Sequence, residues 1–177
     1  MDILALGTVS FRDLIEPVGH APFWYNYLQR LSGTKSGTTG LHVAVLVEPY
    51  LSLVLKGKKT VESRFGANRH PPYGAVFAGD VILLKRAAGP IVGVACATRA
   101  WYFYLNAATL AEIRRRFEGR MCASDDFFWE ERCGANFATL IELGQVTEVA
   151  TPIFCDKRDR RGWVILSSRQ LNLGLGL

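Results

Sequence analysis

The sequence predicts an α+β fold, in which a mixed β-barrel of about five or six strands carries inserted helices and follows a short helical extension. The first observation is that short apolar and β-branched runs alternate with Gly and Pro turn signals from residue 42 onwards. The second is that helical patterns fill only some of the intervals between these runs, which argues against repeated β-α-β units. The 177 residues are therefore divided into an extension (1–40), one barrel domain (41–169) and a tail (170–177).

The N-terminal extension is predicted to contain one helix over residues 20–31, followed by a polar, Gly-rich linker. Trp24, Leu28 and Leu31 recur at i, i+4 and i+7, which is the spacing of one buried helical face. The aromatic residues of this helix either dock it onto the domain, which is the preferred interpretation, or offer a stacking surface for bases: Phe23, Trp24, Tyr25 and Tyr27.

The barrel domain opens with a predicted buried strand over residues 42–47, because this run is continuously apolar and of strand length. A short helix is predicted next, since Pro49 suits a first helical position and Gly57 suits a left-handed helix end. The apolar face of this helix has residues at i, i+3 and i+4, namely Leu51, Val54 and Leu55.

After Gly57 the spacing changes to that of a strand. Thr60, Glu62 and Arg64 alternate with Val61, Ser63 and Phe65, which gives one polar face and one mostly apolar face. Lys59 joins the polar face only if a bend after Gly57 turns it inward. A solvated sheet face is the more frequent meaning of such a pattern. The alternative is a functional site, in which Lys59, Glu62 and Arg64 converge on one concave surface.

Four further strands are predicted at residues 81–84, 91–99, 137–149 and 163–166. A turn at Gly79-Asp80 precedes the first of them, and Gly144 is expected to kink the third or to divide it in two. Residues 155–162 form a predicted charged hairpin or loop.

Two helices are predicted between these strands. The longer begins near Asn106 or Thr109, where Thr109 and Glu112 have the spacing of a capping box. The shorter covers residues 125–132, with Ser124 or Asp125 as its cap.

Composition narrows the classes of function. The net charge of +5 and the pI near 9.2 permit binding to polyanions without requiring it. No apolar run reaches the roughly 18 residues of a membrane span, and no secretory signal is evident, so a cytoplasmic protein is expected. The histidines are far apart, and the cysteines lack metal-site spacing and are expected to be reduced thiols, so no cofactor is predicted: Cys96, Cys122, Cys133 and Cys155.

An ordered set of motifs resembles the activating-signal-cointegrator homology (ASCH) domain, a branch of the PUA-like barrels. The set comprises Pro49-Tyr50, an apolar helix, the run GKKTVESR from Gly57 to Arg64, Pro71-Pro72-Tyr73 and Gly79-Asp80-Val81-Ile82. The resemblance covers residues 41–169 and implies a PUA-like barrel that holds RNA or a modified nucleoside. DNA stays open as an alternative partner, and the oligomeric state is left open.

The ligand site implied by this resemblance consists of Tyr50, Lys59, Glu62 and Arg64, which combine donors, an acceptor and a ring for stacking. A second expected contact is a basic segment that grips the phosphate backbone. The alternative for that segment is a solvated turn whose arginines pair with Asp156 and Asp159. The residues of the segment are Lys157, Arg158, Arg160, Arg161 and the adjacent Trp163.

Catalysis is the alternative to binding. The resemblance includes amidohydrolases of N4-acetylcytidine, whose catalytic lysine is matched by Lys59, but this chain has Glu62 where those enzymes have a hydroxyl residue. Glu118 is a possible match to their helical glutamate. Ribonuclease action would need a base beside the 2′-hydroxyl or a divalent metal held by carboxylates. A third possibility is a protein-interaction module that uses the aromatic N-terminal segment.

Overall fold

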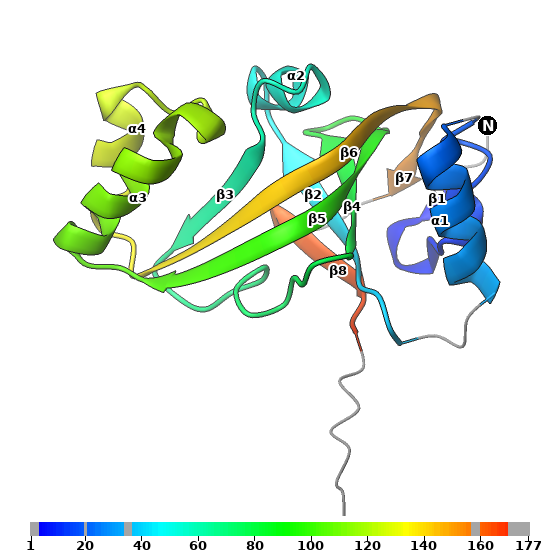
Figure 1. Cartoon of the computed structure of the whole chain (residues 1–177), viewed down its shortest axis with the longest axis horizontal. Coiled ribbons are helices and arrows are strands. Elements are labelled where there is room, and N and C mark those ends of the chain that lie inside the picture. The colour runs from blue at the N-terminus through cyan, green and yellow to red at the C-terminus, as the bar shows by residue number, and fades with distance from the viewer. Residues whose placement is uncertain (1–3, 20, 34–36, 157–159, 170–177) are drawn as a thin grey trace, which may run out of the picture.

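The computed structural model describes residues 4–19, 21–33, 37–156 and 160–169. Its centre is a six-stranded sheet, curled into a half-barrel, with the strand order β3-β6-β5-β4-β2-β8 (Figure 1). The predicted α+β class is therefore confirmed, with β3 and β8 as the two edges of the sheet. The strands are β2 (Leu41–Leu46), β3 (Val61–Gly66), β4 (Val81–Arg86), β5 (Ile91–Tyr104), β6 (Phe137–Ile153) and β8 (Trp163–Ser167).

The sheet is mixed. Strand β2 runs parallel to β4, whereas all other pairs of neighbouring strands in this sheet are antiparallel. The β5–β6 pair is the longest and runs from Tyr104 opposite Phe137 to Ile91 opposite Ile153. The register of this pair shifts near Gly144, where a kink was predicted, and β6 continues through it as one strand. A Cβ atom at Gly144 would lie 2.5 Å from Thr98 Cγ2, so the close approach of the strands requires glycine there.

The described residues form four α-helices around the sheet: α1 (Pro22–Gly33), α2 (Tyr50–Leu55), α3 (Ala107–Met121) and α4 (Asp126–Glu130). The N-cap of α3 is Asn106, whose side chain accepts a hydrogen bond from Thr109 N, so the predicted Thr109 capping box does not form. The predicted cap of α4 is confirmed, since the Asp125 side chain accepts from Phe127 N.

The N-terminal segment shares a core with the sheet. Short 3-10 turns, η1 (Leu6–Thr8) and η2 (Arg12–Leu14), precede α1, and β1 (Leu4–Ala5) pairs with β7 (Cys155–Asp156). The buried face of α1 packs with residues of β2, β4 and β5. Trp24 Nε1 donates to Gln145 O at 2.6 Å and Tyr27 Oη to Gly79 O at 2.5 Å. These contacts support the docking interpretation of the aromatic residues.

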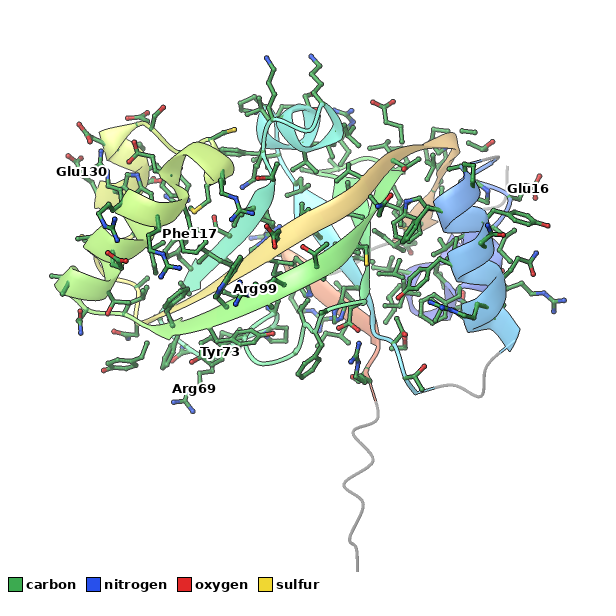
Figure 2. All side chains as sticks on the ribbon, viewed as in Figure 1. Glu16, Arg69, Tyr73, Arg99, Phe117 and Glu130 are labelled. Carbon is green, nitrogen blue, oxygen red and sulfur yellow. The ribbon has the colours of Figure 1, made fainter. Side chains whose placement is uncertain are left out.

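The two faces of the half-barrel are packed differently. On the inner face, Leu51 and Val54 of α2 pack against Ile141 and other sheet residues. On the outer face, α3 and α4 cover β3, β5 and β6. Phe117 of α3, for example, packs edge-on against Trp101 of β5 with ring centroids 5.0 Å apart (Figure 2). None of the described helices has both the length and the apolar character needed to cross a membrane.

Candidate functional site

A bend after α2 places Lys59. Gly57 has a φ of +69°, and the backbone N–H groups of Lys58 and Lys59 both donate to Leu53 O, at 2.9 and 3.0 Å. This bend turns Lys59 inward, so that its side chain is only 4% exposed. Its ammonium group contacts Val61 O at 2.7 Å and also Met121 O and Glu62 Oε2, both at 3.3 Å.

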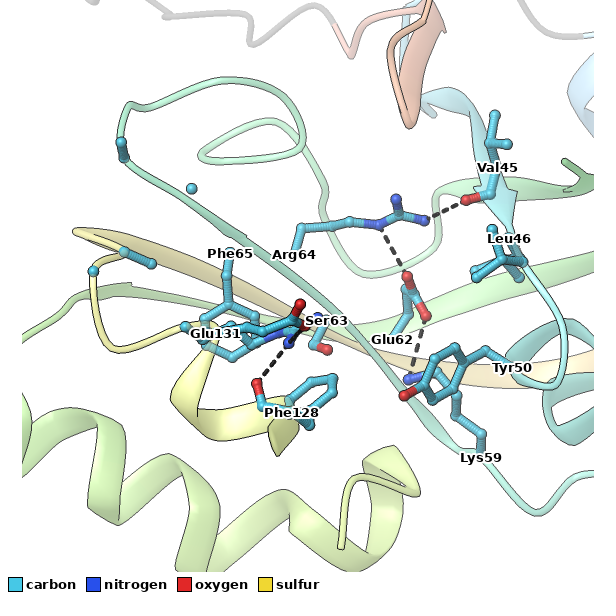
Figure 3. Close-up of a pocket in the computed structure, with 16 residues that line it drawn as sticks. Val45, Leu46, Tyr50, Lys59, Glu62, Ser63, Arg64, Phe65, Phe128 and Glu131 are labelled. Carbon is cyan, nitrogen blue, oxygen red and sulfur yellow. Dashed lines mark hydrogen bonds and ion pairs between the residues drawn. The ribbon is translucent and has the colours of Figure 1, made fainter. Parts of the chain in front are cut away.

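Glu62 lies between two cations. Its Oε2 atom is 3.3 Å from Lys59 Nζ, its Oε1 atom is 2.9 Å from Arg64 Nε, and the residue is 5% exposed (Figure 3). The predicted convergence of the three side chains is therefore confirmed. Removing one cation would leave a buried carboxylate with a single partner, which is costly in a poorly solvated site.

Arg64 joins the two edges of the half-barrel. Its Nη2 atom donates to Val45 O of β2 at 2.9 Å, and its guanidinium lies 5.6 Å from the Trp163 ring of β8. A Cβ atom at Gly162 would lie 2.8 Å from Arg64 Nη1, so a larger residue there would displace the guanidinium. The contact from Arg64 Nε to Glu62 is an ion pair without hydrogen-bond geometry, and Nε is buried with no hydrogen-bond partner among the described residues.

These three side chains form the polar wall of a cavity of about 750 Å³. Lys59 lies 5.6 Å from the Tyr50 ring, which lines the same cavity. The remaining wall comes from α4 and the segment after it. Arg132 lies 3.5 Å from the centroid of the Phe128 ring and 5.6 Å from that of Phe65. The cavity therefore combines a paired carboxylate, cations and exposed ring surface.

Phe65, Phe128 and Arg132 were not among the predicted site residues. Phe65 lies on the outer face of β3, and its ring meets that of Phe128 at a centroid distance of 6.1 Å. The aromatic run at residues 127–129 was the only sequence signal, and it does not reveal that α4 packs beside β3.

Two predicted residues lie elsewhere. Glu118 is not part of the cavity lining, since its carboxylate pairs with Arg114 Nε at 2.9 Å across one turn of α3. Trp163 is 3% exposed and packs in the core, so its ring does not offer a surface for stacking bases. The burial of Trp163 corrects its assignment as a nucleic-acid contact, whereas the catalytic role considered for Glu118 stays a prediction.

The predicted basic segment is described only in part. Lys157 and Arg158 lie outside the described residues. Arg160 and Arg161 are exposed and directly precede Gly162, whose backbone carbonyl accepts a hydrogen bond from Val45 N at 2.9 Å. The end of this segment therefore lies next to Arg64, and its role as a phosphate contact stays a prediction.

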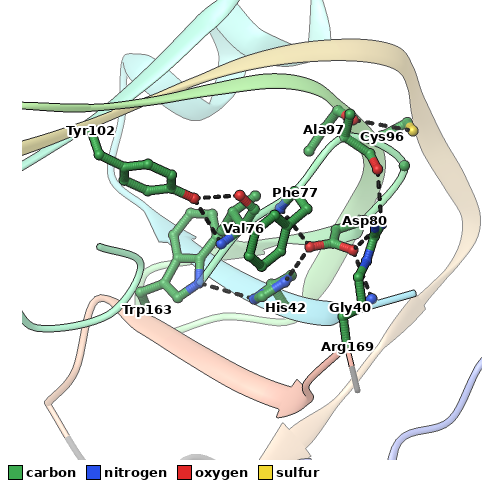
Figure 4. Close-up of polar contacts among 12 residues, drawn as sticks. Gly40, His42, Val76, Phe77, Asp80, Cys96, Ala97, Tyr102, Trp163 and Arg169 are labelled. Atoms are coloured by element: carbon green, nitrogen blue, oxygen red, sulfur yellow. Dashed lines mark hydrogen bonds and ion pairs between the residues drawn. The ribbon is translucent and has the colours of Figure 1, made fainter. Parts of the chain in front are cut away.

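A separate polar network surrounds Asp80, which is fully buried. Its carboxylate accepts hydrogen bonds from Gly40 N and Phe77 N, each at 2.7 Å, and lies 3.2 Å from Arg169 Nη2 (Figure 4). The contact with Phe77 and the φ of +91° at Gly79 confirm the predicted turn. Burial acts to raise the pKa of Asp80, but hydrogen bonds from His42, Gly40 and Phe77 outweigh it and hold the pKa below its usual value.

His42 connects this network to β8. Trp163 Nε1 can only donate, and it lies 3.4 Å from His42 Nδ1, so Nδ1 is the acceptor. The ring proton therefore belongs on Nε2, which donates to Asp80 Oδ2 at 3.3 Å. The Asp80 carboxylate and both ring nitrogens of His42 have partners in this network, which links β2, the turn before β4 and β8. Among the described residues, no group of three or more His, Cys, Asp or Glu side chains is arranged to hold a metal ion.

Comparisons with known proteins give matches in structure alone. No protein-family model matches the sequence, and no curated protein matches it. The crystal structure of ASCH from Zymomonas mobilis superposes with a TM-score of 0.52 at 19% identity, over 64% of this chain and 73% of that chain. The chain has an ASCH-type fold.

Two variants of the Zymomonas mobilis protein support this ASCH-type fold. The first has a TM-score of 0.50 at 20% identity, over 64% of this chain and 75% of that chain. The second has a TM-score of 0.52 at 19% identity, over 67% of this chain and 76% of that chain. The predicted PUA-like fold is confirmed.

Proposed function

We propose that this ASCH-type protein binds RNA or a nucleoside, with a base held in the cavity beside Lys59, Glu62 and Arg64. The observation that carries the proposal is the buried Glu62 carboxylate, fixed between two cations at the wall of an aromatic cavity. A volume of about 750 Å³ lies within the range of small-molecule sites.

The polar wall suits the edge of a base. A carboxylate has about four lone-pair positions, and the contacts to Lys59 and Arg64 leave further positions for an N–H donor. Carboxylates accept hydrogen bonds from exocyclic amino groups such as cytosine N4. Because Lys59 and Arg64 fix the orientation of Glu62, little side-chain entropy is lost when a ligand binds.

The aromatic rings of the cavity and its third cation, Arg132, suit the other parts of a nucleotide. Tyr50, Phe65 and Phe128 line the cavity, and rings in such positions stack bases with little dependence on sequence. Arg132 is held over Phe128 in the same wall, where its guanidinium can pair with a phosphate.

Binding is favoured over hydrolysis by the surroundings of Lys59. Its ammonium group has three donors, and the structure gives it three contacts, with Val61 O, Met121 O and Glu62. This arrangement suits a residue that holds Glu62 in place. The first alternative function is hydrolysis of RNA or of a modified nucleoside. The second alternative is a protein-interaction module.

The test is a binding screen of the full chain against nucleosides, modified nucleosides, single-stranded RNA and single-stranded DNA, with products analysed in the same tubes. We expect saturable binding of at least one nucleoside or RNA, without turnover. Turnover would replace the binding proposal with the hydrolase alternative. If neither nucleosides nor RNA bind, the proposal is wrong and the interaction module takes its place.

A further inference from the structure

An exposed cluster of rings lies at the end of the β5–β6 pair, outside the cavity. Tyr104 is 67% exposed, and its ring centroid is 5.6 Å from that of Phe137, which in turn is 5.2 Å from that of Tyr73. The Arg69 guanidinium lies 5.2 Å from the Phe137 ring and 5.8 Å from the Tyr73 ring (Figure 2). These four residues are called the aromatic platform below.

The platform continues the sheet face that carries Glu62 and Arg64. Tyr104 is directly opposite Phe137, and Phe137 is directly opposite Gly66, so their side-chain positions share one face. Residues at i and i+2 on a strand also share a face, which places Glu62, Arg64 and Gly66 on it. Gly66 lines the cavity, and neighbouring strands are about 4.8 Å apart, so the platform begins about 5–10 Å from the cavity wall.

The charge around the platform favours an anionic partner. Residues 66–79, 88–111 and 132–141, which supply the platform and its neighbours, include neither Asp nor Glu. Arg69 and His70 are exposed beside it, and Arg69 has no ion pair among the described residues. Rings beside a guanidinium, on segments that contain no acidic residue, match the surfaces on which single-stranded nucleic acids stack their bases.

We infer that the aromatic platform is a second base-stacking site for single-stranded nucleic acid. A base stacks on Tyr104 and Phe137, Arg69 contacts an adjoining phosphate, and another base of the same strand occupies the cavity. This inference rests on the function proposed for the cavity. Its consequence is that a short strand binds more tightly than the nucleoside that fits the cavity.

The test compares Tyr104→Ala with Tyr25→Ala, which removes a tyrosine that is 46% exposed on α1. Dissociation constants of the full chain are measured for a nucleoside and for short single strands of RNA and DNA that contain it. Tyr104→Ala is expected to weaken binding of the strand about fivefold to 150-fold. It leaves the nucleoside affinity unchanged, and Tyr25→Ala changes neither affinity.

The role of Arg69 is tested by the salt dependence of strand binding. Arg69→Ala is expected to reduce the slope of log affinity against log salt by about 0.7, the value of one phosphate contact on a single strand. Arg12→Ala removes another exposed arginine on the N-terminal segment and should leave the slope unchanged.

Each outcome separates the two sites. If Tyr104→Ala binds the strand as tightly as the parent does, the platform is not a nucleic-acid site, while the cavity proposal stands on its nucleoside affinity. If Tyr104→Ala weakens binding of the strand but a folded Glu62→Gln binds the strand as tightly as the parent does, the platform stands and the cavity proposal fails. A parent that binds neither RNA nor DNA strands overturns the platform.

Discussion

Lys59, Glu62 and Arg64 depend on one another because two of them are almost fully buried. Lys59 is 4% exposed and Glu62 is 5% exposed, and each compensates the charge of the other. Breaking a buried ion pair by removing one partner typically costs about 3–5 kcal/mol, more than an exposed pair contributes. These three residues therefore contribute to stability as well as to the proposed site. For each variant, both stability and ligand binding must be measured.

The first prediction compares two neighbouring lysines. Lys59→Met should lower the free energy of unfolding by about 3–5 kcal/mol, because it leaves Glu62 buried with Arg64 as its one cation. Lys58→Met is the matched control, since Lys58 is exposed, and should change stability by less than about 0.5 kcal/mol. Denaturant unfolding measures both. Equal stabilities of the two variants would show that Lys59 is not a buried charge partner.

The second prediction compares two glycines. A Cβ atom at Gly40 would lie 2.6 Å from His42 Nε2 and 2.9 Å from Asp80 Cγ, so Gly40→Ala should destabilise the fold by about 1–3 kcal/mol. A Cβ atom at Gly119, on α3, meets nothing within 4 Å, so Gly119→Ala should stabilise by up to about 1 kcal/mol. Melting curves of both variants check this, and a Gly40→Ala protein as stable as the parent would contradict the tight network.

At the scale of elements, β3 is an edge strand, and β6 is its one neighbour among the described strands. Arg64 supplies its connection to the other side of the half-barrel through Val45 O of β2 and the Trp163 ring of β8. One side chain thus links β3 to β2 and β8, two strands that are not its neighbours in the described sheet. The cavity wall lies along this link, so the local stability of β3 determines how well the site is ordered.

The third prediction is that Arg64→Lys loosens β3 locally. A lysine keeps the charge but lacks the planar fork that reaches Glu62 and Val45 O together. Amide hydrogen exchange over residues 61–66 should accelerate, while exchange over β4, which has strands on both sides, stays close to that of the parent. Uniform acceleration across the sheet, or none, would show that Arg64 does not hold this edge.

At the scale of the molecule, Asp80 connects segments that are far apart in the chain. It contacts Gly40 before β2, the turn at Phe77, His42 within β2 and Arg169 after β8. The folded-state pKa of this carboxyl is lowered, so the unfolded chain takes up the proton at higher pH than the folded chain. Asp80 therefore contributes stability above the unfolded pKa of about 3.9, and this contribution disappears as the pH falls towards the folded-state value.

The fourth prediction follows from this loss of stability at acidic pH. The free energy of unfolding should fall as the pH is lowered from about 4, and the fall should be smaller in Asp80→Asn, which lacks the titrating group. Glu130→Gln, which changes an exposed carboxylate on α4, is the control and should keep the slope of the parent. Chemical unfolding at a series of acidic pH values measures the slopes. Parallel curves for Asp80→Asn and the parent would contradict the assignment.

Much of the fold could be predicted from local sequence pattern, whereas the candidate site could be predicted only in part. Strand alternation predicted that Glu62 and Arg64 share a face, and this held because β3 is regular from residue 61 to 66. The inward turn of Lys59 depends on hydrogen bonds to Leu53 O, which alternation does not encode. Glu118 lies outside the cavity lining and pairs with Arg114 one helical turn away, so its tentative catalytic role stays a prediction. By contrast, the packing of α4 beside β3, which brings Phe128 and Arg132 to the cavity, is tertiary and cannot be predicted from local pattern.

The most direct test of the central claim is the affinity of Glu62→Gln for the tightest nucleoside or RNA found by screening. Glutamine keeps the shape but removes the charge that pairs with Lys59 and Arg64. Loss of a charge-assisted hydrogen bond costs about 1.5–3 kcal/mol, so binding should weaken roughly tenfold to a hundredfold. Glu16→Gln, at an exposed position, should bind as the parent does. Melting is measured alongside, and a folded Glu62→Gln that binds every ligand as tightly as the parent would show that Glu62 is structural.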